Sequence, residues 1–286
     1  MDTILLLTDF SDNALHAAQY ACTIARQLGY QRIVLHHAYE VMVPVAPGIA
    51  IGQVNNSIES TYDPEYDRIM REANLKTLEE LKAGLAHFAG EDLTLECSTS
   101  SLDLASGTAD AIENYGASLV MMGVTGTDGL DRMLLGSNAA RVMESAVCPV
   151  LLVPLEAPIQ PVRRITLACD LQHIDETIPL AELEEILDGF QAPLTVLKVG
   201  EVKPEDQSGA DFLHMLLERY QPTFDLVENK DTVTGIMEHA SLQTTSMVIV
   251  IQRKHGFFRD LFHKSVTNKL ADQTRIPLLV LHEKKA

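Results

Sequence analysis

The chain of 286 residues contains no tryptophan, few aromatic residues (5%) and only four cysteines. These cysteines, Cys22, Cys97, Cys148 and Cys169, lie far apart and form neither a C-x-x-C motif nor a Cys/His spacing typical of zinc. The spacing indicates neither a disulfide framework nor a metal site. We therefore expect buried free thiols and no bound metal.

The sequence also lacks any apolar run close to the roughly 20 residues that a membrane-spanning helix requires. Its first residues, MDTILLLTDFSDNA, have neither the basic region nor the cleavage site of a secretion signal. Positive charge is scarce, since 22 Lys and Arg stand against 40 Asp and Glu, a net charge of −18. Such a chain repels polyanions at long range. We expect a cytoplasmic protein whose main partner is neither nucleic acid nor a membrane.

What the sequence does contain indicates a well-folded protein. Its hydrophobic fraction of 46% is enough to build a sizeable core. A chain of 286 residues is too long for one ordinary core and fits two domains of roughly 140 residues each.

The two parts of the chain repeat one another. Residues 118–153 align without a gap on residues 246–281, which lie 128 positions later. Near the start of each copy the offset is 161 positions, because ILLLTD ending at Asp9 matches ITLACD ending at Asp170. In the same way IVLHHA ending at Ala38 matches LTVLKV ending at Val199. The chain therefore carries the same unit twice.

The change of offset locates an insertion and a boundary. It places 33 extra residues between the second and third strands of the first copy, in the region that contains the insertion at 40–62. Pro158 and Pro161 interrupt regular structure between the copies. We predict one domain over residues 1–155 and a second over residues 162–286.

Short apolar runs alternate with helical patterns in both copies, which is typical of a parallel sheet covered on both faces. The predicted strands lie near 3–8, 32–38, 93–97, 118–123 and 149–153, then 164–169, 194–199, 223–228, 246–251 and 277–281. Right-handed crossovers then give an α/β fold of two tandem doubly wound five-stranded sheets, each with a crevice at the carboxyl ends of its strands.

The sequence of the first helix predicts both of its ends and its buried face. Ser11 is expected to cap it and Gly29 to end it. Its predicted apolar stripe consists of Leu15, Ala18, Cys22, Ala25 and Leu28.

A glycine-rich loop follows the fourth predicted strand. Gly123 and Gly126 are separated by nine residues from Gly136 and Ser137, which open a helix. Glycine lets backbone N–H groups approach a ligand, and a helix N-terminus favours an anion. The loop is neither a Walker A motif nor a dinucleotide fingerprint, and the same glycines could serve turn geometry alone.

Taken with an Asp that ends the first strand, this spacing resembles the universal stress protein family (UspA-like) in its tandem-domain form, with an adenine nucleotide alpha hydrolase-like fold. The resemblance implies that Asp9 and the main chain at Ala38 hold adenine and ribose. It implies that Gly123, Gly126, Gly136 and Ser137 hold phosphates, flanked by Met122 and Asn138. The implied ligand is ATP, with Mg²⁺ or Mn²⁺ as a possible companion.

Individual residues also have simpler interpretations. Asp9 could serve only as an acid at the start of the first helix, because Ser11 and Asp12 follow at once. His36 and His37 look like a metal-binding pair, but adjacent strand residues point to opposite faces, which favours two histidines with ordinary partners.

The second copy has lost the glycines. Ile251 stands at the position of Gly123, and Lys254 and Lys264 stand at those of Gly126 and Gly136. We expect ATP binding to fail there. The same stretch is basic. Its side chains either keep a loop in contact with solvent or form a different anion site; they are Arg253, Lys254, His255, Arg259, His263 and Lys264.

The sequence favours a regulatory, stress-response module that binds an adenine nucleotide and acts on a protein partner that the sequence does not identify. The alternatives are a slow ATP hydrolase, for which Asp128 and Asp131 are the local candidates, and a nucleotide-free structural protein.

The fifth strands, CPVLLVP and IPLLVLH, can pair antiparallel within one chain, giving an intramolecular pseudo-dimer, and a homodimer stays open. The apolar insertion is expected to fold over the crevice or to pack on a neighbouring surface.

Overall fold

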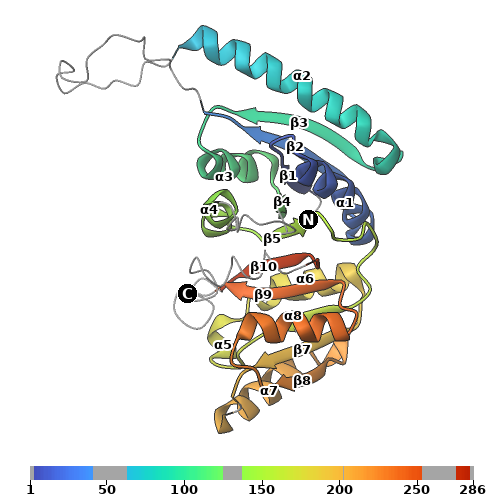
Figure 1. The fold of residues 1–286 in the computed structure, drawn as a ribbon, viewed down its shortest axis with the longest axis vertical. Coiled ribbons are helices and arrows are strands. Elements are labelled where there is room, and N and C mark those ends of the chain that lie inside the picture. The colour runs from blue at the N-terminus through green and yellow to red at the C-terminus, as the bar shows by residue number, and fades with distance from the viewer. Residues whose placement is uncertain (1–2, 41–62, 125–136, 202, 253–274, 284–286) are drawn as a thin grey trace, which may run out of the picture.

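The computed structural model describes residues 3–40, 63–124, 137–201, 203–252 and 275–283 (Figure 1). In the first half the elements are β1 Thr3–Leu7, α1 Asp12–Leu28, β2 Arg32–Ala38, α2 Pro64–Ala89, β3 Thr94–Ser100, α3 Leu104–Tyr115, β4 Leu119–Val124, α4 Ser137–Ser145 and β5 Val150–Pro154. The strand bounds agree closely with those predicted from the apolar runs.

The second half repeats this order with a different first crossover. Its elements are β6 Ile165–Ala168, α5 Ile174–Thr177, α6 Leu180–Phe190, β7 Leu194–Val199, α7 Pro204–Leu216, the 3₁₀ turn Glu218–Tyr220, β8 Thr223–Val227, α8 Thr232–Leu242, β9 Met247–Gln252 and β10 Leu278–His282. The segment between β5 and β6, which contains Pro158 and Pro161, forms no helix or strand.

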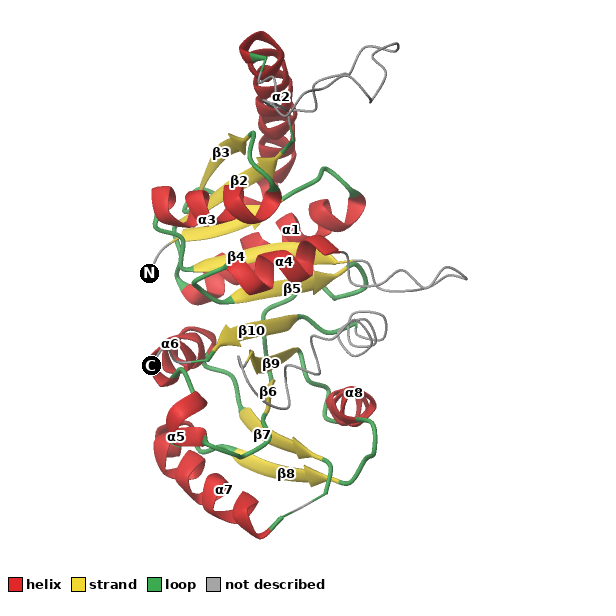
Figure 2. Ribbon diagram, turned by 90° about the vertical axis from the view of Figure 1, so that its left-hand side faces the viewer, coloured by secondary structure: helices red, strands yellow, loops and turns green. Residues whose placement is uncertain are grey.

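The ten strands in the described part of the chain belong to one sheet, in the order β3-β2-β1-β4-β5-β10-β9-β6-β7-β8. Each half is parallel and reverses its strand order beside its first strand, so the predicted doubly wound α/β fold is confirmed. The halves join through β5 and β10, which pair antiparallel with Leu279 opposite Leu151. This is the predicted pairing of the two fifth strands, and it continues one sheet through the whole molecule (Figure 2).

Helices cover both faces of the sheet, as the continuous apolar strands require. Helices α1, α2, α6 and α7 pack on one face with strand residues such as Ile4 and Leu6. Helices α3, α4 and α8 pack on the other face with residues such as Leu5 and Leu7. Alternate residues of β1 therefore point into two different apolar layers.

Helix α1 begins and ends as predicted. The Ser11 hydroxyl accepts a hydrogen bond from the Ala14 N–H, and Gly29 adopts a left-handed conformation with φ 73°. The predicted stripe is wrong at one end, because Leu15 is 40% exposed whereas Ala14, Ala17 and Ala21 are buried. Small residues face the sheet here and let the helix approach it closely, so the larger Leu15 side chain is left on the solvent side.

Helix α1 also contacts the second half. The Gln27 side-chain amide donates to the carbonyl oxygens of Val162 (2.8 Å) and Phe190 (3.1 Å), and its oxygen accepts from the Val162 N–H (2.7 Å). His16 donates through Nε2 to the Ala157 carbonyl at 2.8 Å. One helix thus runs from the carboxyl edge of the first half to the junction of the halves.

Candidate functional site

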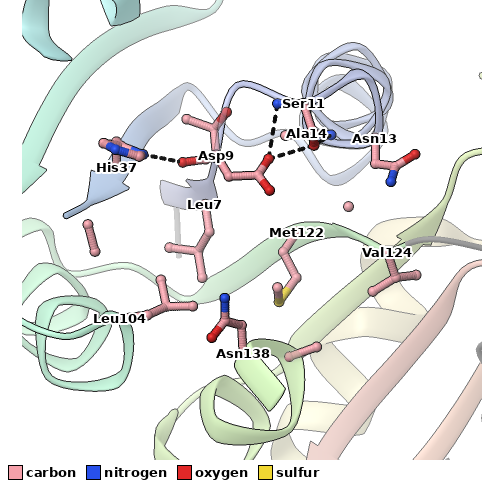
Figure 3. A pocket seen from close by; sticks show the side chains of 14 residues that line it. Leu7, Asp9, Ser11, Asn13, Ala14, His37, Leu104, Met122, Val124 and Asn138 are labelled. Atoms are coloured by element: carbon pink, nitrogen blue, oxygen red, sulfur yellow. Dashed lines mark hydrogen bonds between the residues drawn. The ribbon is translucent and has the colours of Figure 1, made fainter. Parts of the chain in front are cut away.

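A cavity of about 260 Å³ lies at the carboxyl edge of the first half (Figure 3). It is bounded by the ends of β1, β2 and β4, the first turn of α1, and the starts of α3 and α4. Strand order reverses between β1 and β4, and in open α/β sheets ligands bind at such a switch point. The fold therefore places this cavity where a ligand site is expected.

Asp9 lies on the loop between β1 and α1, and its two carboxylate oxygens have different surroundings. Oδ1 accepts hydrogen bonds from the Ser11 N–H at 3.0 Å and the Ser11 hydroxyl at 2.5 Å. Oδ2 has no partner among the described residues, and Asp9 lines the cavity. The acid therefore supports the start of α1, as its simpler interpretation predicts, and still offers one oxygen to a ligand.

The loop that carries Asp9 has an unusual backbone. Phe10 has φ 64°, a left-handed conformation that costs a bulky residue about 1–2 kcal/mol. The Phe10 N–H donates to the Thr8 hydroxyl at 3.0 Å, and its ring packs 4.5 Å from the His37 ring, centroid to centroid. Leu171, at the matching position of the second half, has φ 61°. Both copies therefore use the same turn to place the acid that precedes it.

Ala38 ends β2 and lines the cavity beside His37. The His37 Nδ1 atom donates to the Thr8 carbonyl oxygen at 2.7 Å, because a carbonyl can only accept. His37 has the ordinary partner that was expected of it, and it is in addition a wall residue of the cavity.

Gly123 is one of the cavity residues, and its neighbourhood explains why it has no side chain. A Cβ atom at this position would lie 2.4 Å from the Asn13 carbonyl oxygen and 3.0 Å from the Ala14 nitrogen. Both of those atoms belong to the first turn of α1. Glycine at 123 is therefore required for the packing of α1 against β4, whether or not a ligand is bound.

Met122, Asn138 and Leu104 lie below Asp9 in the view of Figure 3, and Leu7, at the end of β1, lines the cavity next to Asp9. Ser137 is the first residue of α4. Gly126 and Gly136 lie outside the described residues, as do Asp128 and Asp131, most of the insertion and the basic segment of the second half. The structure thus brings together five of the eight residues singled out in the sequence: Asp9, Ala38, Met122, Gly123 and Asn138.

The sequence analysis did not assign the other nine lining residues to the site, and three of them illustrate the reason. Asn13 comes from the first turn of α1, Leu104 opens α3, and His37 was interpreted only as a partnered histidine. In the sequence, the only clue that such a residue lines the cavity is its position just after a strand or at the start of a helix. Many residues share that position, so the packing of the helices against the sheet decides which of them line the cavity.

His36 points to the opposite face from His37 and is only 2% exposed. Its Nδ1 atom lies 3.1 Å from the Ser98 hydroxyl, and Nε2 has no partner among the described residues. Burial, aided by the neighbouring charge of His37, lowers the pKa of His36 to about 4. The ring is neutral at physiological pH and belongs to the core.

The other candidate chemistry is limited. Among the described residues no group of three or more His, Cys, Asp or Glu side chains is arranged to hold a metal ion. Cys22, Cys148 and Cys169 are buried free thiols as expected, whereas Cys97 is only half-buried. Burial raises the pKa of the Cys22 and Cys97 thiols to about 11 and that of Cys148 to about 12, which keeps these groups protonated and unreactive.

No helix in the described part of the chain has the length and apolar character needed to cross a membrane.

Comparison with known proteins agrees with this architecture. A sequence model of the universal stress protein family matches residues 1–154. A universal stress protein of Methanocaldococcus jannaschii is 30% identical over 152 residues, which cover 52% of this chain and 80% of that protein. The universal stress protein YxiE of Bacillus subtilis is 26% identical over 152 residues, covering 52% of this chain and 97% of YxiE.

Solved structures extend the likeness over the full length. A universal stress protein from Archaeoglobus fulgidus superposes with a TM-score of 0.70 at 16% identity, covering 98% of both chains. A putative universal stress protein from Pseudomonas aeruginosa gives a TM-score of 0.57 at 14% identity, covering 99% of this chain and 94% of the other. These two likenesses concern the fold. The family model, which matches residues 1–154 and so more than half of the chain, shows that this chain belongs to the universal stress protein family.

Proposed function

We propose that the first half binds one adenine nucleotide, ATP, and that the protein acts as a regulatory binding module in the cytoplasm. The observation that carries this proposal is the cavity at the switch point. Five residues chosen from the sequence by their likeness to the family's nucleotide motif line this single cavity.

The chemistry of the cavity walls suits the adenosine part of the ligand. Leu7, Leu104 and Met122 offer apolar surface to a base. Oδ2 of Asp9 can accept a hydrogen bond from a ribose hydroxyl or a base amine. A volume of about 260 Å³ is small for a whole nucleotide, so the phosphates are expected to extend toward the N-terminus of α4.

A binding role fits the lining better than a catalytic one. Asp9 and His37 are the titratable residues of the described lining, and each already uses one polar atom to hold the β1–α1 loop. An enzyme needs a base or a water-positioning group near the reacting phosphate. Asp128 and Asp131, the candidates for slow hydrolysis, lie outside the described residues.

We expect one site per chain. In the second half Ile251 takes the place of Gly123, and its side chain is buried, with 1% exposed. In the first half the corresponding space is taken by the first turn of α1. The aligned glycines are also absent from the second half, so its crevice lacks the features that support ATP binding in the first.

Titration calorimetry with ATP, with and without Mg²⁺, tests the proposal in two ways. It gives the number of ATP molecules bound per chain, and it compares the ATP affinity of the parent with that of Asp9→Asn. Asparagine keeps an oxygen for the Ser11 N–H but removes the negative charge and one acceptor oxygen. We expect ATP to bind at one site per chain and the variant to bind about tenfold or more weakly, since a hydrogen bond to a charged group contributes about 1.5–3 kcal/mol.

Asp12→Asn is the matched control, because Asp12 lies three residues away, is exposed and does not line the cavity. Its ATP affinity should equal that of the parent. Two equivalent sites per chain, or equal affinities for the Asp9 and Asp12 variants, would contradict the assignment.

A further inference from the structure

Another cavity lies at the junction of the two halves, and the proposed nucleotide site does not explain it. It lies among α1, the segment between β5 and β6, and the residues that precede β9 and β10. Its described lining includes Tyr20, Gln160, Thr245, Ser246 and Arg275. The volume of about 230 Å³ is below the roughly 300–1,000 Å³ of pockets for drug-sized ligands, so an occupant must be small.

Tyr20 is the buried polar residue of this cavity. It comes from the middle of α1 and is 1% exposed. Its hydroxyl has no hydrogen-bond partner among the described residues, whereas a buried tyrosine hydroxyl usually has one. Burial raises the pKa of the Tyr20 phenol, so the group is protonated at neutral pH and can donate. The hydroxyl is therefore available to an acceptor in the cavity.

Two further side chains offer donors to the same cavity. Gln160 and Arg275 are exposed, and neither side chain has a hydrogen bond or ion pair with the described residues. An amide supplies two N–H donors and a guanidinium group five. The hydroxyls of Thr245 and Ser246 already have partners within the protein. The described lining thus combines three unused donor groups with no carboxylate.

The charges nearest to the cavity favour an anion, although the whole chain is acidic. Within four positions of a lining residue the sequence contains three arginines and two acids: Arg163, Arg164, Arg275, Glu156 and Asp272. The N–H groups of Arg163 and Arg164 donate to the Ser246 hydroxyl at 2.8 and 2.9 Å, so these residues begin at the cavity wall. Glu156 does not line the cavity, and Asp272 lies outside the described residues. Because charges beyond about 8 Å are largely screened at physiological ionic strength, this local excess matters more than the net charge of −18.

We propose that this cavity binds a small tetrahedral oxyanion such as inorganic phosphate, which accepts hydrogen bonds from Tyr20, Gln160 and Arg275. Guanidinium groups pair well with phosphate oxygens. A tetrahedral anion also presents more oxygens than a carboxylate to donors that come from three separate segments. Tyr20 belongs to the first half and Arg275 to the second, so the bound anion connects the halves. This site does not depend on the nucleotide site of the first half.

An amide NMR titration of the full chain with inorganic phosphate tests the proposal, with chloride at equal ionic strength as the control probe. Phosphate should produce saturable shifts at the Thr245 and Ser246 amides, which line the cavity, and chloride should not. Asp9→Asn should leave these shifts intact, so the outcome is separate from that for the nucleotide site. Absence of saturable shifts with phosphate, or equal shifts with chloride, overturns the proposal.

Tyr20→Phe removes the buried hydroxyl and keeps the ring. We expect its phosphate affinity to fall about tenfold, because a hydrogen bond to a charged group is lost. Its melting temperature without phosphate should equal that of the parent, since the hydroxyl has no partner within the described protein. Tyr39→Phe is the matched control, because the Tyr39 hydroxyl donates to Asp67 at 2.8 Å. That variant should melt at a lower temperature and bind phosphate as the parent does.

Equal phosphate affinity of the Tyr20 and Tyr39 variants refutes the role of Tyr20. Equal losses of melting temperature would show that the Tyr20 hydroxyl is satisfied within the protein, which also overturns the proposal. Arg275→Gln removes the cation of the lining and should weaken phosphate binding about tenfold or more. Arg141→Gln removes an exposed arginine of α4 that does not line the cavity and should leave phosphate affinity unchanged. Equal phosphate affinity of these two variants contradicts the assignment of Arg275.

Discussion

Gly123→Ala is the substitution whose effect follows most directly from the geometry. The added Cβ would lie 2.4 Å from the Asn13 carbonyl oxygen, where ordinary contact begins at 3.4 Å, so the first turn of α1 must move by about 1 Å. Overpacking of this kind costs about 1–3 kcal/mol. Asn13 and Ala14 also line the cavity, so we expect a loss of ATP affinity together with the loss of stability.

Gly84→Ala is the matched control for the same chemical change. Gly84 is exposed in the interior of α2, and an added Cβ there meets nothing within 4 Å. Alanine should stabilise this helix by about 0.5–1 kcal/mol relative to glycine. The free energies of unfolding of the two variants should therefore differ by about 1.5–4 kcal/mol in urea titrations.

Urea unfolding of both variants, followed by ATP titration, gives a clear decision. If Gly123→Ala is as stable as Gly84→Ala, the close approach of α1 to β4 does not exist in solution. If Gly123→Ala loses stability but binds ATP as tightly as the parent, then the position of the first turn of α1 does not shape the nucleotide site.

Two further predictions concern the core and the junction of the halves. The pKa of His36, about 4 in the folded state against about 6.5 unfolded, means that only the unfolded state gains this proton between those pH values. The free energy of unfolding should thus fall by up to about 3 kcal/mol on acidification from pH 6.5 to 4. Urea titrations at each pH should show that His36→Gln removes this part of the decrease. An unchanged pH dependence in the variant would be evidence against a buried neutral imidazole. Gln27→Met should cost about 3 kcal/mol, because three hydrogen bonds to Val162 and Phe190 are lost. Gln31→Met is the matched control, because Gln31 is exposed, and it should change the melting temperature little. Equal melting temperatures for the Gln27 and Gln31 variants would show that the Gln27 contacts do not hold the halves together.

The agreement between sequence and structure is closest for the strands. Runs such as those at 32–38 and 194–199 form β2 and β7 with the predicted bounds, because a strand buried on both faces needs a continuous apolar stretch. The antiparallel pairing of β5 with β10 was also predictable, since both runs are apolar and each would otherwise leave an open edge.

The site was predicted less completely than the sheet. Asp9 and Ala38 could be located because Ala38 ends β2 and Asp9 lies two residues after the end of β1, and parallel strands end at the same edge. Leu104 and Asn13 could not, because helix starts are numerous and the sequence does not say which of them meet. Leu15 was placed on the wrong side because helical periodicity alone does not show how closely a helix of small residues approaches its sheet.

The sequence by itself determined that this protein is one α/β unit used twice, since apolar runs, caps and the order of strands and helices are encoded locally along the chain. Only the tertiary structure decided what occupies each crevice. Gly123 meets the first turn of α1 more than a hundred residues earlier in the chain, and Lys198 meets Asp206 across the end of β7. Such contacts depend on how helices pack against the sheet. The cavity at this strand edge is therefore lined by His37 in one half and by Lys198, which is paired with Asp206, in the other.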